Sequence, residues 1–194
     1  MLLVHPREVR STVGTAWILR RSISNLKWVR SNGLGIDDNQ PFQELIGSPE
    51  HSPLLLFPGE NAFNLNQGSL EEWAQLVPQG KRPLFVVIDG TWTEAKVMLQ
   101  RSHVLKSLPR VSFDVSKESE YGFKRQPHPS CLSSVEGVHR VIELLANRGM
   151  GALPSEREHD QMLQIFKRMV RVQLGFNGFR SRQDSCSPGK NSGT

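Results

Sequence analysis

The residues best suited to chemistry in this sequence are Asp89 and Trp92, which follow an unbroken apolar run over 84–88. Such a run predicts a strand buried on both faces of a parallel sheet. Ligands of open α/β folds bind just beyond the carboxyl ends of these strands, where a carboxylate and an indole can hold or activate them. The simpler interpretation is a turn followed by a helix start, with Thr91 as N-cap and Glu94 as its capping-box partner. The cap explains neither Asp89 nor Trp92, so both interpretations of Asp89 stay open.

A second group of candidate residues lies between Tyr121 and Glu136. Lys124 and Arg125 are followed by two prolines and by a helix-opening Ser-Ser-x-Glu pattern that starts at Ser133. A basic loop in front of a helix N-terminus can hold an anion. The alternative is a capping box made by Ser133 and Glu136, which we favour for those two residues taken singly.

Two further patterns suggest little chemistry. Phe57-Pro58-Gly59-Glu60 ends another apolar run, and we favour an ordinary turn, although a glycine also lets a ligand approach the backbone. His5 and Glu8 could be a metal pair, but no third ligand follows at a matching spacing, so we expect no metal. The sequence has no Walker loop, no G-x-G-x-x-G and no G-x-S-x-G element, which argues against nucleotide hydrolysis and Ser-triad catalysis.

Alternating strands and helices must position these residues. The sequence predicts strands over 2–4, 53–57, 84–88 and 110–115, with helices from about Ser11, over 68–76, after the strand 84–88, over 133–147 and over about 156–174. Gln40-Pro41 indicates loop or irregular structure. This order favours an α/β fold, with a mainly parallel sheet and helices on both faces. We expect one domain over 1–178 and a disordered tail over 179–194.

Helical spacing assigns a buried face to each predicted helix. In chain order, the residues expected inside are Ala16, Leu19 and Ile23; Leu70, Trp73 and Leu76; Ala95, Met98, Leu99 and Leu105; Val135, Val138, Val141, Ile142 and Leu145; and Met162, Ile165, Met169 and Val172.

Composition and net charge limit the cellular location and the kind of binding partner that can be expected. The 194 residues carry a net charge of +5 and have a pI near 9.6, which indicates either a nucleic-acid partner or a solvated basic surface. Two cysteines are too few for a disulfide framework, and no apolar run approaches the roughly 20 residues of a membrane-spanning helix. The first six residues do not have the pattern of a signal peptide. We therefore expect a cytosolic protein without a membrane segment.

Several motifs in order resemble those of the DTW-domain proteins. They are His5-Pro-x-Glu8, Ser11-Thr-Val-Gly-Thr15, Phe57-Pro-Gly-Glu60, Asp89-Gly-Thr-Trp92 and Tyr121…Arg125…Leu132-Ser-Ser-Val-Glu136. The resemblance covers about residues 2 to 176. It implies a tRNA-uridine aminocarboxypropyltransferase, which moves the 3-amino-3-carboxypropyl group of S-adenosylmethionine to N3 of a tRNA uridine. It also implies a SPOUT-like fold with a carboxy-terminal trefoil knot, and a cytoplasmic location, or a nuclear one in a eukaryote.

The resemblance also implies roles for individual residues. Asp89 is the expected base, or a carboxylate that orients the uracil or the cofactor amine. Trp92 stacks on an aromatic ring or packs in the core, and we favour packing. The residues expected around the cofactor are Phe57, Pro58, Gly59, Thr91, Trp92, Leu132, Ser133, Ser134 and Glu136. Those expected to bind RNA are Arg10, Lys124 and Arg125.

The chain departs from the family pattern in two respects. Members commonly carry an amino-terminal cysteine cluster ahead of the His-Pro-x-Glu motif, and this chain begins after it. Ser133-Ser134 stands where the family usually has Ser-Thr, which keeps a hydroxyl. Two other functions fit the same residues, namely a SPOUT-type RNA methyltransferase and a non-catalytic RNA-binding module. The sequence leaves the oligomeric state open.

Overall fold

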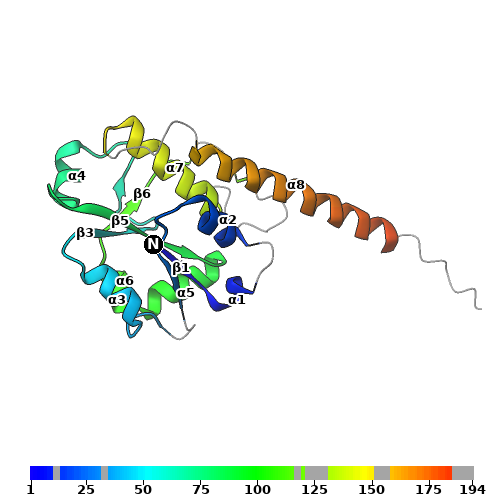
Figure 1. The fold of residues 1–194 in the computed structure, drawn as a ribbon, viewed down its shortest axis with the longest axis horizontal. Coiled ribbons are helices and arrows are strands. Elements are labelled where there is room, and N and C mark those ends of the chain that lie inside the picture. The colour runs from blue at the N-terminus through cyan, green and yellow to red at the C-terminus, as the bar shows by residue number, and fades with distance from the viewer. Residues whose placement is uncertain (11–13, 32–34, 116–118, 121–130, 151–157, 185–194) are drawn as a thin grey trace, which may run out of the picture.

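The computed structural model describes residues 1–10, 14–31, 35–115, 119–120, 131–150 and 158–184. Its centre is a sheet of six parallel strands in the order β2-β1-β5-β3-β6-β4 (Figure 1). The strands are β1 (Leu2–Val4), β2 (Trp28–Arg30), β3 (His51–Leu56), β4 (Phe63–Asn64), β5 (Arg82–Asp89) and β6 (Arg110–Ser112). The sequence predicted four of these strands, while β2 and the two-residue β4 were not predicted.

The strand register brings the carboxyl ends of the central strands to one edge of the sheet. Val4 of β1 pairs with Asp89 of β5, and Leu56 of β3 pairs with Val111 of β6. Parallel strands need long crossover connections, and here helices supply most of them. The loops that follow β1, β3, β5 and β6 therefore meet at this edge.

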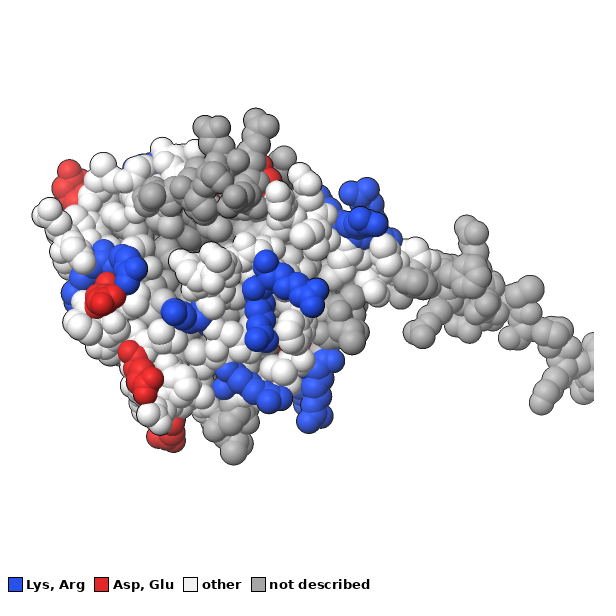
Figure 2. Space-filling view, viewed as in Figure 1, with Lys and Arg blue, Asp and Glu red and all other residues white. Residues whose placement is uncertain are grey.

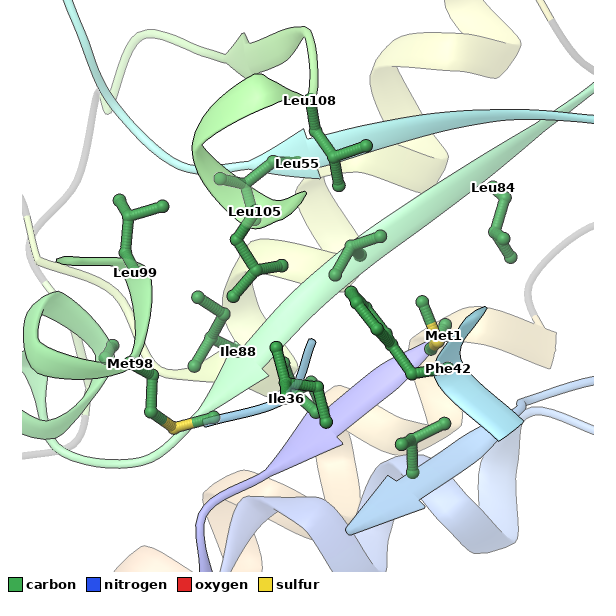
Figure 3. Packing of buried hydrophobic residues seen from close by; sticks show 14 residues of the cluster. Met1, Ile36, Phe42, Leu55, Leu84, Ile88, Met98, Leu99, Leu105 and Leu108 are labelled. Carbon is green, nitrogen blue, oxygen red and sulfur yellow. The ribbon is translucent and has the colours of Figure 1, made fainter. Parts of the chain in front are cut away.

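One face of the sheet is covered by α3 (Gln40–Gly47), α5 (Trp92–Arg101) and α6 (His103–Ser107). Alternate residues of β5 point toward this side, since side chains alternate across a strand. Figure 3 shows the resulting cluster, in which Phe42 and Leu105 from the helices lie near Ile88 from β5. The buried members are Met1, Leu3, Val29, Ile36, Phe42, Leu55, Leu84, Val86, Ile88, Ala95, Met98, Leu99, Leu105 and Leu108.

The opposite face is covered by α2 (Thr15–Ser22), α4 (Leu70–Leu76), α7 (Ser134–Asn147) and α8 (Glu158–Asp184). Phe85 and Val87, the intervening residues of β5, contact the clusters on this side. The four-residue helix α1 (Pro6–Val9) follows β1 directly. An α/β fold with a parallel sheet and helices on both faces is thus confirmed. The trefoil knot remains a prediction.

The prediction of irregular structure at Gln40-Pro41 was wrong, because these residues begin α3. The Asn39 side chain accepts a hydrogen bond from the backbone N–H of Phe42 at 3.0 Å and so caps the helix. Pro41 lies in the first turn, where a helix needs no N–H donor. A proline that we interpreted as a helix breaker is therefore part of a helix start.

Three other helices differ from prediction at their ends. Among the described residues α2 begins at Thr15 rather than near Ser11, and Ile23 lies just beyond its last residue. The helix after β5 divides at Ser102, whose Oγ accepts from the backbone N–H of Leu105 at 2.9 Å and starts α6. Leu70 was expected inside, but as the first residue of α4 it is 55% exposed.

The buried face of α8 was also predicted incorrectly in part. Ile165 and Val172 are 52% and 49% exposed, whereas Phe166 and Val170 are buried beside Met162. Met162, Phe166 and Val170 are four residues apart, and side chains at this spacing lie along one stripe of a helix. The most buried stripe of α8, which packs against α2 and α7, therefore follows a four-residue step, with the predicted Met169 partly buried beside it.

The helix α8 continues to Asp184, into the segment expected to be a disordered tail. Residues 185–194 lie outside the described residues, and the division of the chain at residue 178 stays a prediction. Within the described residues, no helix combines the length and apolar character needed to cross a membrane.

Candidate active site

A cavity of about 1090 Å³ opens at the carboxyl edge of the sheet. Its walls are formed by the ends of β3, β5 and β6 and by the first turns of α5 and α7. This is where the ligand crevice of an open α/β fold is expected. Eight of the ten residues predicted for catalysis or cofactor binding line it, namely Phe57, Pro58, Asp89, Thr91, Trp92, Leu132, Ser133 and Ser134.

Asp89, the last residue of β5, is only 1% exposed. Its Oδ1 accepts a hydrogen bond from Thr15 Oγ1 at 2.9 Å, and Thr15 itself is the first residue of α2. Its backbone carbonyl accepts from the N–H of His5 at 2.9 Å, which continues the pairing between β1 and β5. The backbone of Asp89 is therefore held by the segment after β1, and its carboxylate is held by the start of α2.

The helix start after Asp89 is a complete capping box, as predicted. Thr91 Oγ1 accepts from the backbone N–H of Glu94 at 3.2 Å, and the Glu94 carboxylate accepts from the backbone N–H of Thr91 at 2.9 Å. Gly90 precedes this cap, and a Cβ at this residue would stand 3.3 Å from His5 Cβ and 3.4 Å from Glu94 Cβ. The glycine thus allows the turn to pack closely against the end of β1.

Glu94 also binds the segment that follows β1. Its Oε1 lies 3.3 Å from His5 Nδ1 and 3.5 Å from Arg7 Nη1. Burial alone would raise the pKa of Glu94, but the hydrogen bonds from Thr91 and the nearby His5 and Arg7 outweigh it and lower the pKa. Glu94 is thus held as a carboxylate that fixes α1 against the start of α5.

The start of α7 repeats this arrangement across the cavity. Ser133 Oγ accepts from the backbone N–H of Glu136 at 3.3 Å, and the Glu136 carboxylate accepts from the backbone N–H of Ser133 at 2.8 Å. Glu136 also accepts from Ser119 Oγ at 2.7 Å and from the backbone N–H of Glu120 at 2.7 Å. Glu136 does not line the cavity; it fixes residues 119–120 against the helix start.

Gly59 also does not line the cavity, although we predicted it beside the cofactor. A Cβ on Gly59 would lie 2.7 Å from Arg110 Nη1. The close neighbour of this glycine is therefore an arginine side chain of β6.

Two aromatic rings meet at the cavity wall. The centroids of Phe57 and Trp92 are 5.8 Å apart, and the rings are tilted by 56°. Trp92 is partly exposed and lies outside the three buried clusters, which differs from the core packing that we favoured. The indole is instead available to a ligand in the cavity.

Several cavity residues were not among the predicted site residues, including Glu8, Thr15, Lys96, Asp114 and Cys131. Glu8 and Thr15 belong to the ordered motifs found in the sequence, which was the signal that could have identified them. No sequence signal indicated Asp114, which is exposed and accepts hydrogen bonds from Asn64 Nδ2 at 2.8 Å and Gln67 Nε2 at 2.9 Å. These bonds hold the pKa of Asp114 below its ordinary value.

The residues predicted to bind RNA are only partly described. Arg10 is exposed, ends α1 and does not line the cavity. Lys124 and Arg125 lie outside the described residues. Among the described residues, most of the predicted cofactor residues thus lie together at the cavity, and Arg10 lies outside its lining.

Comparisons with known proteins point in one direction. The family model described as the DTW domain matches residues 1–174. A tRNA-uridine aminocarboxypropyltransferase 2 of Drosophila melanogaster is 28% identical over 152 residues, which cover 76% of this chain and 56% of that protein. Proteins of the same name from Macaca fascicularis and Mus musculus are each 24% identical over 144 residues, covering 74% of this chain and 46% of those proteins. The chain thus spans about half the length of these relatives. No solved structure matches it significantly.

Proposed function

We propose a function for this chain from one premise: it belongs to the DTW-domain family, whose model matches residues 1–174. The proposed reaction transfers the 3-amino-3-carboxypropyl group of S-adenosylmethionine to N3 of a uridine in tRNA and releases methylthioadenosine. The observation that carries the proposal is that three relatives with the name tRNA-uridine aminocarboxypropyltransferase 2 match about three quarters of the chain. The geometry of the cavity supports it independently.

The size of the cavity fits a reaction with two bound partners. Single-ligand pockets typically enclose about 300–1,000 Å³. At about 1090 Å³ this cavity exceeds that range, so it has room for a cofactor and for one nucleotide. A uridine inside folded tRNA must leave its base stack to enter such a pocket.

The cavity walls match the chemical parts of S-adenosylmethionine. The Phe57 and Trp92 rings offer apolar faces for an adenine or a uracil. The N-termini of α5 and α7 both open onto the cavity, and helix N-termini favour an anion such as the cofactor carboxylate. Thr91, Ser133 and Ser134 supply hydroxyl and backbone groups at these two helix starts. In this proposal Gly59 and Glu136 act from outside the cavity, through Arg110 and residues 119–120.

Asp89 is the proposed catalytic residue. S-adenosylmethionine supplies an electrophilic methylene beside its sulfonium, and the uridine must lose its N3 proton to attack it. The Asp89 carboxylate accepts the N3–H of the uracil, either as the base that removes the proton or as the group that orients the ring before deprotonation. As N3 bonds to the methylene, the carbon–sulfur bond breaks and methylthioadenosine departs with the electron pair.

The charge distribution supports an RNA partner. Residues 7 to 30 contain six Lys or Arg and one Glu, a net charge of +5 that equals the net charge of the whole chain. These basic residues, Arg7, Arg10, Arg20, Arg21, Lys27 and Arg30, are all exposed. We call residues 7–30 the basic segment. In Figure 2 blue side chains gather over the part of the surface where α1 lies, while most of the red lies elsewhere on that face.

The basic segment reaches the proposed reaction centre at Thr15, although none of its six basic side chains lines the cavity. It includes α2, whose first residue, Thr15, binds Asp89 inside the cavity. On the outer side of α2 the Arg20 guanidinium lies 5.3 Å from the Trp17 ring and 5.0 Å from the Trp28 ring. Phosphate contacts by such residues would hold the tRNA backbone beside the cavity, with an affinity that falls steeply as salt rises.

Product analysis tests the proposed reaction. The purified chain is incubated with S-adenosylmethionine and bulk tRNA, and the small products and tRNA nucleosides are identified by mass spectrometry. Methylthioadenosine with aminocarboxypropyluridine supports the proposal. If the products are S-adenosylhomocysteine and a methylated nucleoside, the enzyme is a methyltransferase and the proposed reaction is wrong. If calorimetry shows that the protein binds RNA but not S-adenosylmethionine, the protein is a non-catalytic RNA-binding module.

A charge reversal tests the basic segment. Arg20→Glu with Arg21→Glu should weaken tRNA binding at least tenfold and reduce the slope of log affinity against log salt by about two. Lys81→Glu with Lys106→Glu is the matched control, because both lysines are exposed just before β5 and β6, at the opposite edge of the sheet from the cavity. Equal loss in both variants would mean that the total charge, rather than this surface, determines binding.

A further inference from the structure

We propose that His139, His159 and Asp160 bind a zinc ion that joins α7 to α8. The site lies outside the residues that line the cavity, so the inference goes beyond the proposed function. His139 is 7% exposed in the second turn of α7, and the other two residues lie in the first turn of α8. One potential ligand atom from each residue lies within 4.8 Å of the other two.

The distances between these atoms suit a zinc ion. Nitrogen and oxygen ligands at about 2.0–2.1 Å from tetrahedral zinc lie about 3.3–3.4 Å from each other. Here His139 Nε2 is 2.9 Å from Asp160 Oδ1, and His159 Nε2 is 3.6 Å from the same oxygen. These two distances bracket the expected value, and the third, between the two imidazole nitrogens, is no more than 4.8 Å, so the ion would draw the two rings together. Two imidazoles and a carboxylate form a donor set that zinc accepts.

The surroundings of His139 also fit a metal ligand. Its Nδ1 faces Glu143 Oε2 at 3.7 Å, one helical turn further along α7. A metal-bound histidine usually donates its second ring N–H to a carboxylate or carbonyl, which sets the tautomer and the ring orientation. At 3.7 Å Glu143 is beyond direct hydrogen-bond distance, but it lies on the Nδ1 side of the ring, and Nε2 is the nitrogen that faces Asp160.

His159 distinguishes a metal site from a simple hydrogen bond. A His139–Asp160 hydrogen bond would explain those two residues, but the His159 ring packs beside His139 with centroids 5.0 Å apart. The His159 side chain is 11% exposed, and its Nδ1 has no hydrogen-bond partner among the described residues. Its Nε2, at 3.6 Å from Asp160, is too distant for a hydrogen bond. A zinc ion between the three side chains would give Nε2 of this ring the partner that Asp160 alone does not supply.

The ion would act through the position of α7. The first turn of α7 forms one wall of the cavity, and the proposed site fixes the same helix to α8 one to two turns further along. Asp160 is 42% exposed, so water has access to a fourth coordination position. The earlier expectation of no metal considered only His5 and Glu8, because ligands from two separate helices share no sequence spacing.

Zinc binding to the full chain tests the site. Tag-free protein is stripped with a chelator, dialysed and titrated with zinc chloride by calorimetry, while thermal unfolding is followed by circular dichroism. We expect one zinc per chain. At a hundredfold excess over Kd, zinc should raise the Tm by about 5–10 °C.

Substitutions locate the ion. His159→Gln and Asp160→Asn should each weaken zinc binding at least tenfold and reduce the zinc-dependent rise in Tm. His103→Gln is the matched control, because His103 is exposed on α6. The His103→Gln protein should bind zinc with the affinity of wild type. Asp160→Asn keeps the size of the side chain, so it tests the site even if the His159→Gln protein does not fold. Absence of stoichiometric binding to wild type, or wild-type affinity in folded Asp160→Asn, would overturn the proposal.

Discussion

Asp89 and Asp114 line the same cavity near the ends of two strands, but the protein surrounds them differently. Asp89 is almost fully buried, and a buried hydroxyl, that of Thr15, donates to its carboxylate. Asp114 is exposed, and two surface amides, those of Asn64 and Gln67, donate to its two oxygens. The same residue type thus occupies a dry environment and a wet one within a single site.

This difference in environment indicates which of the two carboxylates can take part in proton transfer. The hydrogen bonds from Asn64 and Gln67 lower the pKa of Asp114, so it stays ionised and holds the end of β4 and the residues after it against the segment that follows β6. Asp89 is buried, and in such an environment a hydrogen bond such as the one from Thr15 is stronger than in water. Enzymes often assign different roles to two carboxylates in this way. The predictions below test whether this contrast holds.

The largest effect is expected for Asp89→Asn. The amide keeps the shape of the side chain but cannot accept the uridine proton, so aminocarboxypropyl transfer should fall by about 10²- to 10⁴-fold. The measurement is the initial rate of methylthioadenosine release, with circular dichroism to check the fold. A rate within a few-fold of wild type would remove Asp89 from the reaction.

Thr15→Val should have the next largest effect. It removes the hydroxyl that donates to Asp89 and keeps a similar volume, and such bonds to charged groups contribute about 1.5–3 kcal/mol. We expect roughly a tenfold loss of rate at neutral pH. The loss of a donor to the ionised form raises a carboxyl pKa, so the acid side of the pH–rate profile should move to higher pH.

Thr93→Val is the control for that substitution, because Thr93 is exposed at the rim of the same cavity. A loss of rate in Thr15→Val without any shift of the pH–rate profile would mean that Thr15 supports α2 rather than the carboxylate.

Asp114→Asn should change the transfer rate by less than roughly threefold, as exposed substitutions usually do. The amide can keep part of the hydrogen-bond network with the β4 loop. If this variant lost as much activity as Asp89→Asn, the assignment of the two carboxylates would have to be reversed.

The smallest effect is a pH dependence of stability. Because folding lowers the pKa of Asp114, its ionised form stabilises the folded state at every pH above the unfolded value of about 3.9, and this contribution is lost as the pH falls through the lower folded pKa. Urea unfolding at a series of pH values should therefore give a small constant difference between wild type and Asp114→Asn above about pH 5. The difference should disappear in stronger acid. A difference that grows in acid would contradict the lowered pKa.

Local patterns allowed much of the site to be predicted. The apolar run before Asp89 predicted a buried strand, and the spacing of Thr91 from Glu94 and of Ser133 from Glu136 predicted two capping boxes. Both features depend on residues that are close in sequence, so no tertiary information was needed. The same reasoning failed at Pro41, because a proline is compatible with the first turn of a helix as well as with a loop.

Contacts between distant segments could not be predicted in this way. Thr15 and Asp89 are 74 residues apart, and Asp114 lies 50 residues from Asn64 and 47 from Gln67. Strand order decides which of these residues meet, and the order β2-β1-β5-β3-β6-β4 leaves no trace in spacing or composition. The face of α8 was misjudged for a related reason, since Ile165 and Phe166 are both apolar and only the packing distinguishes them.

The hydrogen bond between Thr15 and Asp89 also has a thermodynamic consequence. One helix, α2, carries two arginines of the basic segment on its outer side and the donor to the buried carboxylate at its first residue. If a polyanion on the outer side shifts α2, it changes the proton affinity of Asp89. By reciprocity, a change in the protonation of Asp89 then alters the affinity for the polyanion by the same factor. Such coupling would let substrate capture and proton removal regulate each other without a separate effector site.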